Sequence, residues 1–487
     1  MKKQTPEEKI ARLKEALKQK NSELKKYKQR DKYNKQAKKQ LKAKLKTEEK
    51  NFEQKKALER AAQNELRTED KGAVLGRRYS ERIIRTCVKL YLRDKCGFRG
   101  VSEILAIFNE EFGIGESVSH TSISDWVKTT GLALYKEACA DIRSAGMKYA
   151  LVIDESITIG SQKLLLVLAI PSEHKRHALT HKDVKVVGMF VAKSWNSEDI
   201  SKKLQGIMDD ITYSPEYVLS DNGHNLVKAT EKLSLLHHKD IGHTFGIILK
   251  DAYGEDPEFK EITTEIGKAR LRFHLTSKAY LLPPNQRSIA RFMNCFDWVE
   301  WGNRIIENFP KLTEEQQLAF AFIPKHKELL EELSCVMECY KYVMEKVKND
   351  GLSIKLYREL RLYVANILAT QNSHRVRKVL LRVWTYLKEE VEKLRPYEWA
   401  HNLSSDIIES TFGVFKERKS PNKLYGVTAF VLFIPAHAGV TAMSTAKPID
   451  FKRIFSEYHL KDTDDWKKEN LLINWVVERT NTLKKVG

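Results

Sequence analysis

Three acidic residues stand where predicted elements of the chain end or begin. Asp154 ends the apolar run YALVID, Asp221 ends the run YVLSD, and Glu409 lies in the predicted helix of SSDIIESTFGVFKER. Mg²⁺ and Mn²⁺ prefer carboxylate oxygens as ligands. Two such ions about 3.5–4 Å apart stabilise both the attacking and the leaving oxygen of a phosphodiester displacement. The residue types therefore predict a catalytic site in which these carboxylates hold two divalent ions.

Each of these acids also has a simpler interpretation. An aspartate at a strand end can serve only as a cap, and the Ser-Asp-Asn-Gly sequence around Asp221 is good turn chemistry. Asp406 and Glu417 are alternative acids near Glu409. Glu155 would point to the opposite face of its strand, so we do not expect it in the site. No single acid predicts a catalytic site; the prediction rests on all three acids occurring in this order along the chain.

The segments around the first two acids predict a mixed sheet within residues 147–255. Strand-like apolar runs occupy 148–154, 163–170, 184–192 and 217–221. Helices are expected at 197–211, with Ser197 as cap, and at 224–236, and HKDIGH begins a fifth strand or turn. This order predicts helices on the faces of a mixed sheet. Strand signals then vanish over 256–400, which predicts an all-helical insertion before residues 401–445 return the chain to the site.

Residues 76–146 predict a helix-turn-helix DNA-binding domain. Helices are expected at about 79–93, 101–113 and 119–132. Ser119 or Thr121 can cap the third helix, whose inward side at helical spacing consists of Ile123, Trp126 and Val127. A short capped helix after a tight turn is typical of DNA recognition. The outward residues are the expected DNA contacts: His120, Ser122, Ser124 and Lys128. An ordinary three-helix bundle is the alternative.

Residues 1–75 predict a basic helical or coiled-coil region. Residues 1–70 carry 23 Lys or Arg against 12 Asp or Glu. A seven-residue register runs through Ile10, Leu13, Leu17, Leu24, Tyr27, Leu41, Leu45 and Phe52. Several core positions of this register are polar: Lys20, Asp31, Asn34 and Lys38. A solvated basic helix that orders when DNA binds is therefore the alternative. At the other end, residues 446–487 are expected to form a basic tail.

The bulk composition favours a polyanionic partner. The chain has 487 residues with 42% hydrophobic content, enough for two or more domains, and a formal net charge of +20. Six cysteines without a CxxC pair suit a reducing compartment. No apolar signal segment and no apolar run of about 20 residues is visible. We therefore expect no membrane association and a cytoplasmic location, nucleoid-associated if the protein is prokaryotic.

The order of three strands, helix, strand, helix, strand and a late acidic helix resembles the ribonuclease-H-like core of DDE transposases. In that family the carboxylates fall where Asp154, Asp221 and Glu409 fall here. Asp240 and His243 in HHKDIGHTFG resemble the C/D-x-x-H element of several cut-and-paste superfamilies. The resemblance covers roughly residues 76–445 and implies a multidomain α+β fold with a sheet core interrupted by the helical insertion.

A second signature is matched in part. Lys416 lies seven residues after Glu409, two helical turns along the same face, and resembles the E-(6)-K element of bacterial transposases. The Tyr and Arg that precede this Glu in the signature would fall on Asn402 and Ser405, so the subtype stays open.

The resemblance implies metal-dependent cleavage of transposon ends and strand transfer into target DNA. Partners would be double-stranded terminal inverted repeats and target DNA, and joining two ends implies at least a dimer. Auxiliary roles are expected for Asp240, which would orient His243. Phosphate contacts are expected from Lys416, Arg418 and Lys419. A transposase-derived DNA-binding protein without catalysis and a ribonuclease-H-like nuclease are the alternatives.

Overall fold

The computed structural model describes residues 10, 14–26, 28, 31, 38, 42, 79–94, 96–112, 117–156, 162–276, 279–285, 295–394, 399–421, 426–442 and 449–486. The chain divides into two compact units, residues 1–73 with 80–82, and residues 74–79 with 83–487. In the first unit, the described residues between 10 and 42 are helical and exposed, Leu17 and Leu24 included. Ile10 of the predicted heptad register is also described and exposed, whereas the remaining register residues lie outside the described residues: Leu13, Tyr27, Leu41, Leu45 and Phe52.

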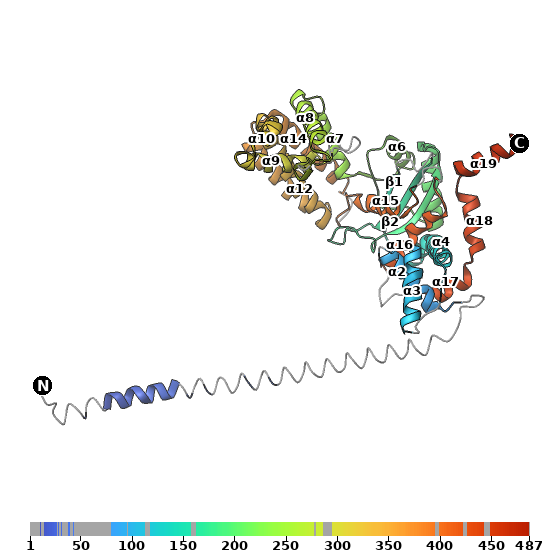
Figure 1. Ribbon diagram of the computed structural model, residues 1–487, viewed down its shortest axis with the longest axis horizontal. Helices are drawn as coiled ribbons and strands as arrows, with labels where there is room; N and C mark the ends of the chain where they lie inside the picture. The colour runs from blue at the N-terminus through green and yellow to red at the C-terminus, as the bar shows by residue number, and fades with distance from the viewer. Residues whose placement is uncertain are drawn as a thin grey trace. The chain divides into compact units, whose positions relative to one another are not determined.

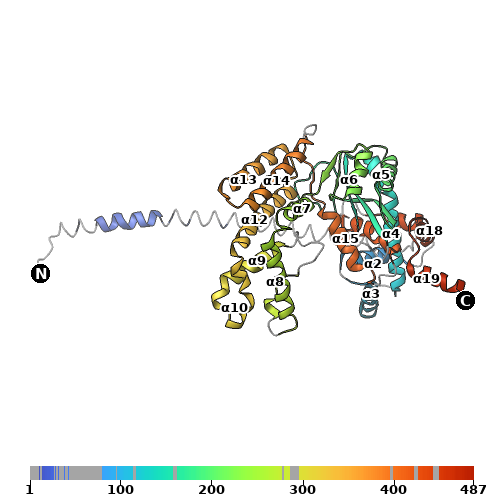
Figure 2. The ribbon, with the colours of Figure 1, turned by 90° about the horizontal axis from the view of Figure 1, so that it is seen from above.

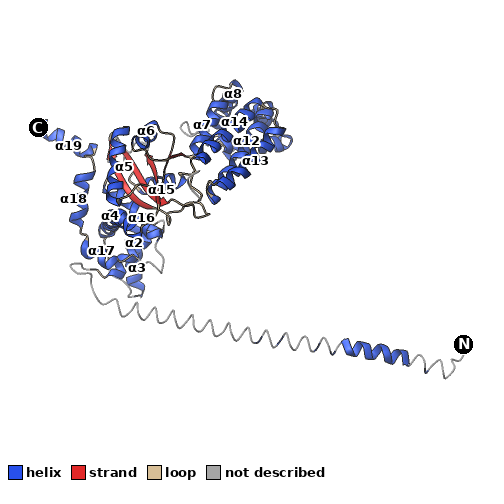
Figure 3. Ribbon diagram, turned by 180° about the vertical axis from the view of Figure 1, so that it is seen from behind, coloured by secondary structure: helices blue, strands red, loops and turns tan. Residues whose placement is uncertain are grey.

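A five-stranded mixed sheet forms the centre of the second unit (Figures 1 and 3). Its strands are β1 (Tyr149–Glu155), β2 (Lys163–Pro171), β3 (Lys185–Ala192), β4 (Val218–Ser220) and β5 (His237–Lys239). The spatial order is β3-β2-β1-β4-β5. β1, β2 and β3 pair antiparallel, whereas β1, β4 and β5 pair parallel. The predicted mixed sheet is therefore confirmed, with the HKDIGH segment supplying a short fifth strand.

Both faces of the sheet are covered by helices, which explains the continuous apolar runs of β1 and β2. One face packs on α5 (Ser197–Ile211) and α6 (His224–Lys232). The other packs on α15 (Asp406–Arg418) and α16 (Phe433–Ala442). The bounds of α5 agree with the prediction, but its cap does not: the side chain of Asn196 accepts the Asp199 N–H, so Asn196 rather than Ser197 is the N-cap.

Three helices precede the sheet: α2 (Glu81–Arg93), α3 (Phe98–Phe112) and α4 (His120–Ala145). Ser119 caps α4 by accepting the Ser122 N–H, and the expected inward residues are buried: Ile123, Trp126 and Val127. α4 extends well beyond the predicted end at residue 132, to a left-handed Gly146. The turn at 113–116 lies outside the described residues, so the helix-turn-helix assignment stays a prediction.

A separate helical region follows β5 and has its own hydrophobic core (Figure 2). Its elements are α7 (Ile241–Tyr253), α8 (Pro257–Phe273), η2 (Ala279–Leu281), α9 (Cys295–Asn308), η3 (Phe309–Lys311), α10 (Glu314–Phe320), α11 (Phe322–Lys325), α12 (Lys327–Asp350), α13 (Ile354–Thr370) and α14 (His374–Glu392). Helix therefore begins at Ile241, earlier than the predicted residue 256. Among the described residues of 256–400, β pairing is limited to an isolated bridge from Leu352 to His401.

The last part of the chain is more than a tail. After α15 come η5 (Ala429–Leu432), α16, α17 (Phe451–Glu457), α18 (Leu460–Asn470) and α19 (Trp475–Val486). Phe451, Phe455 and Trp466 are buried in the same core as the sheet. Within the described parts of the chain, no helix has both the length and the apolar character that a bilayer span requires.

Candidate active site

Asp154 and Asp221 lie at the same level on neighbouring strands. In the parallel register of β1 and β4, Ile153 is the partner of Ser220. Asp154 is the next residue of β1, and Asp221 directly follows the last residue of β4. Because paired strands lie about 4.8 Å apart, the register brings the two carboxylates side by side at the end of the sheet.

The same two residues face α15. Side chains alternate between the faces of a strand, and Val152 and Leu219, two residues earlier, both belong to the core that contains α15. Asp154 and Asp221 continue this alternation. Glu155 turns away, as expected, and forms an ion pair with a lysine of β2 at 2.9 Å.

The negative charges of Asp221 and Glu409 act on Asp154 at this end of the sheet. Burial, together with these two charges, raises the pKa of Asp154 to about 7, while the charge of His243 acts in the opposite direction. The charge of His243 likewise opposes the rise that burial causes in the pKa of Glu409. The structure therefore brings all three predicted acids and His243 into one neighbourhood.

Glu409 reaches this neighbourhood from the first turn of α15. Its Oε1 lies 3.6 Å from Nε2 of His243, and 54% of its side chain is exposed. The alternative acid Asp406 instead forms an ion pair with Lys348 of α12. Glu409 is thus the acid of α15 that contacts the predicted auxiliary histidine.

Asp240 connects the histidine to the start of α15. It is the N-cap of α7, and its Oδ1 accepts the His243 N–H at 2.7 Å and lies 3.1 Å from His243 Nδ1. Its Oδ2 accepts the backbone N–H of Ser405, the N-cap residue of α15, at 2.6 Å. The hydrogen bond with Asp240 raises the pKa of His243 to about 9. One buried carboxylate therefore orients His243 and positions the helix that carries Glu409.

Buried polar groups hold the segment before α15, and the sequence did not point to them. The N–H and the side-chain amide of Asn402 donate to Tyr217 Oη at 3.0 and 3.2 Å. His238 lies 2.9 Å from His401 and 2.7 Å from Glu390 of α14. A buried network therefore holds residues 401 and 402 against Tyr217, β5 and α14.

The carboxylates of the site are the oxygen donors that hard cations such as Mg²⁺ prefer, but they do not lie close enough together to surround one ion. Within the described residues, no group of three or more His, Cys, Asp or Glu side chains is placed so that it could hold a metal ion. Asp221 Oδ1 accepts the Gly223 N–H at 2.8 Å, so the turn role of Asp221 is also present. Oxygen donors fit Mg²⁺ or Mn²⁺, and a cation would relieve the mutual repulsion of the carboxylates, which would have to move closer together.

The basic residues of α15 have three different surroundings. Lys416 lies close enough to Asp154 and Glu409 for both to raise its pKa, against a larger lowering by burial. Arg418, a predicted phosphate contact, donates from its guanidinium to backbone carbonyls of Tyr91, Asp94 and Cys96 at 2.6–3.3 Å and so joins α15 to the end of α2. Lys419 Nζ donates to the Ser420 carbonyl.

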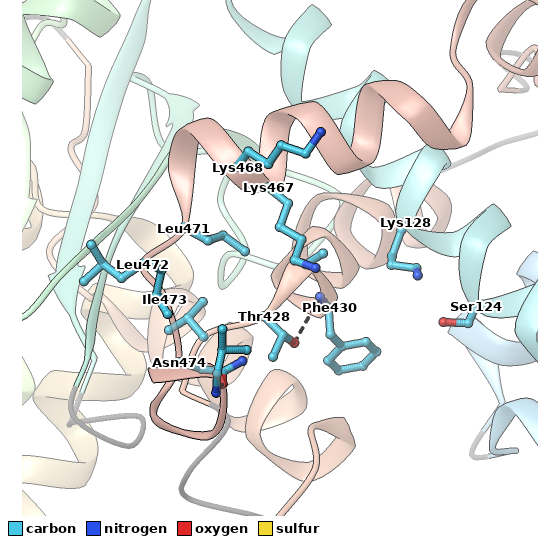
Figure 4. A pocket seen from close by; sticks show the side chains of 13 residues that line it. Ser124, Lys128, Thr428, Phe430, Lys467, Lys468, Leu471, Leu472, Ile473 and Asn474 are labelled. Carbon is cyan, nitrogen blue, oxygen red and sulfur yellow. Dashed lines mark hydrogen bonds between the residues drawn. The ribbon is translucent and has the colours of Figure 1, made fainter. Parts of the chain in front are cut away.

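The predicted DNA contacts on α4 are only partly open. His120 is exposed, whereas Ser122, Ser124 and Lys128 are half-buried. Ser122 Oγ lies 3.0 Å from Ser119 Oγ. Lys128 forms an ion pair with Asp125 at 2.6 Å. Ser124 and Lys128 also border a cavity (Figure 4).

Comparisons with known proteins add little. No family model matches the chain, and no curated protein matches it. A solved structure, the Drosophila P element transposase strand transfer complex, is similar at 12% identity with a TM-score of 0.40, over 81% of this chain and 100% of that chain.

Proposed function

We propose that this chain is a DDE-type DNA transposase that cleaves transposon ends and joins them to target DNA. The observation that carries the proposal is the parallel register of β1 and β4. It sets Asp154 beside Asp221 on the face of the sheet where α15 presents Glu409. Convergence of carboxylates from separate parts of the chain at one sheet end is what metal-assisted phosphodiester chemistry requires.

Asp154, Asp221 and Glu409 would hold two Mg²⁺ or Mn²⁺ ions. When bound, the ions would activate water or a 3′-hydroxyl and neutralise charge on the leaving oxygen. His243 would act as a positioning residue for Glu409, since Asp240 fixes its ring. The high net charge of +20 favours double-stranded DNA as the partner. Joining two ends in one event calls for at least a dimer.

The experiment uses the full chain, a labelled duplex made from the DNA that flanks the gene, and a supercoiled plasmid. We expect joining of the label to the plasmid with Mg²⁺ or Mn²⁺ and none with EDTA. Glu409→Gln should abolish joining. Asp406→Asn is the matched control on the same helix and should retain joining, because Asp406 contacts Lys348 instead of the site.

The outcomes separate the alternatives. Duplex binding without any metal-dependent cleavage would identify a DNA-binding protein without catalysis. Metal-dependent cleavage without joining would identify a ribonuclease-H-like nuclease. Either result overturns the proposal, as does joining that survives in Glu409→Gln.

A further inference from the structure

A cavity of about 580 Å³ lies between α4, the segment that enters η5, and the α18–α19 connection (Figure 4). We call it the α4–α18 groove. Ser124 and Lys128 border it on α4, and Lys467 borders it on α18. Phe430 and Ile473 are among the apolar residues that line it. The groove therefore combines the α4 residues predicted to bind DNA with a lysine from the C-terminal helices.

The described charged residues that line the groove are all lysines. Among the described residues that line it there are three lysines and no Asp or Glu. Figure 4 shows the side chains of Lys128 and Lys467 extending into the space above Phe430, from opposite sides. Lys468 borders the groove with its stem, but its ammonium is directed away and pairs with Asp465 at 2.9 Å. Lys128 also pairs with Asp125 at 2.6 Å, so an anion held between Lys128 and Lys467 would share the Lys128 ammonium with that carboxylate.

The walls of the groove are fixed by buried contacts. Gln162 is 2% exposed and bridges two of them: its Oε1 accepts the Val427 N–H at 2.9 Å, and its Nε2 donates to the Ile473 carbonyl at 3.3 Å. A Cβ atom on Gly131 of α4 would lie 1.9 Å from the carbonyl oxygen of Leu432. The groove is thus preformed rather than opened by a ligand.

We propose that the α4–α18 groove binds the phosphodiester backbone of duplex DNA, with Lys128 and Lys467 on the phosphates and Ser124 donating to a phosphate oxygen. The assignment of the groove as a phosphate-binding site rests on charge complementarity and on its continuity with the α4 face. The choice of DNA as the bound molecule rests on the proposed function. Lys467 is then a DNA contact that the sequence did not suggest. The C-terminal helices form the second wall of the interface that α4 begins.

The test compares two neighbouring lysines in the full chain. Binding of a fluorescein-labelled duplex is measured by anisotropy in EDTA, at salt concentrations from about 50 to 200 mM. We expect Lys467→Ala to weaken binding at least several-fold and to reduce the slope of log K against log salt by about 1, as expected for one lost phosphate contact. Lys128→Ala should act in the same direction. Lys468→Ala removes the same charge one residue away and should stay within about twofold of the unchanged chain.

Equal binding by Lys467→Ala and Lys468→Ala overturns the proposal. So does single-stranded RNA that competes as well as duplex DNA at equal nucleotide concentration, since the occupant would then not be DNA. Lys467 is exposed, and a thermal unfolding midpoint equal to that of Lys468→Ala checks that its variant is folded. Joining activity of the unchanged chain is measured separately. If the unchanged chain joins DNA but Lys467→Ala and Lys468→Ala bind duplex equally well, the groove proposal is wrong and the proposed function stands. If Lys467→Ala weakens binding but the unchanged chain does not join DNA, the proposed function is wrong and the groove proposal stands.

Discussion

At the carboxylate site, the functional groups are on short side chains attached to backbone that is held by hydrogen bonds. In the α4–α18 groove, by contrast, the cations lie at the ends of long lysine side chains. Asp154 lies in β1 and Asp221 directly follows β4, and Asp240 accepts the backbone N–H of Ser405, the N-cap residue of α15. Lys467 is exposed and extends from the last turn of α18. Catalysis needs precise placement of the reacting groups, which short side chains on a held backbone provide. Neutralisation of DNA phosphates needs less precision, so long, exposed lysine side chains suffice.

This difference predicts opposite behaviour of variants in the two regions. Loss of a carboxylate should remove chemistry and leave DNA binding nearly unchanged. Loss of a groove lysine should weaken binding in a graded, salt-dependent way. Variants that mix the two patterns would show that the two regions are not separate in function.

The largest effect is expected for Asp154→Ala and Asp221→Ala. Each should lower the rate of end cleavage at least about 1000-fold, or about 4 kcal/mol at about 1.36 kcal/mol per tenfold, because a ligand of the proposed ions is lost. Duplex binding in EDTA should change less than about twofold, since neither acid is a phosphate contact. Single-turnover cleavage and anisotropy measure the two quantities. Glu155→Ala is the matched control, because Glu155 faces away from the site, and wild-type cleavage in either Asp variant would remove that residue from the site.

An intermediate effect is expected for Asp240→Asn. Asparagine can still cap α7, but it removes the charge that holds His243, so cleavage should fall about 10–100-fold, as for groups that orient metal ligands. The pKa of His243, raised to about 9 in the structure, should fall toward its ordinary value, as an NMR titration of the imidazole would show. Asp450→Asn, at the cap of α17, is the control and should leave both quantities unchanged. An unaltered His243 pKa in Asp240→Asn would exclude the orienting role of Asp240.

Much of the sheet could be predicted because its strands are buried on both faces. The apolar runs of β1, β2 and β3 stand out from the sequence, and the two acids at the strand ends follow from them. The pairing could not be predicted, because the three-residue β4 pairs with a β1 strand more than sixty residues earlier in the chain, and such contacts leave no local periodicity. The polar network around His238 and the α4–α18 groove could not be predicted either, because both form between residues that are far apart in the chain.

The length of α4 shows how a local signal can mislead. Thr-Thr-Gly before Leu132 resembles a helix end, because glycine commonly follows the last turn. In the structure the helix continues through Gly131, and the absent side chain allows close approach to Leu432 of η5. The glycine therefore serves tertiary packing, and tertiary packing overrode the local propensity.

The smallest effect is expected from Gly131→Ala, which tests whether the frame of the groove is as rigid as that of the carboxylate site. The added Cβ would lie 1.9 Å from the Leu432 carbonyl oxygen, a backbone atom that cannot move alone, so the free energy of unfolding should fall by about 1–3 kcal/mol. Gly206→Ala in α5 is the control: its Cβ meets nothing within 4 Å, and it should raise stability by about 0.5–1 kcal/mol through helix propensity. Urea unfolding measures both. Because α4 and η5 are walls of the groove, Gly131→Ala should also weaken duplex binding while Gly206→Ala does not. Unchanged stability and binding in Gly131→Ala would show that the groove adapts, and that its cations need no rigid frame.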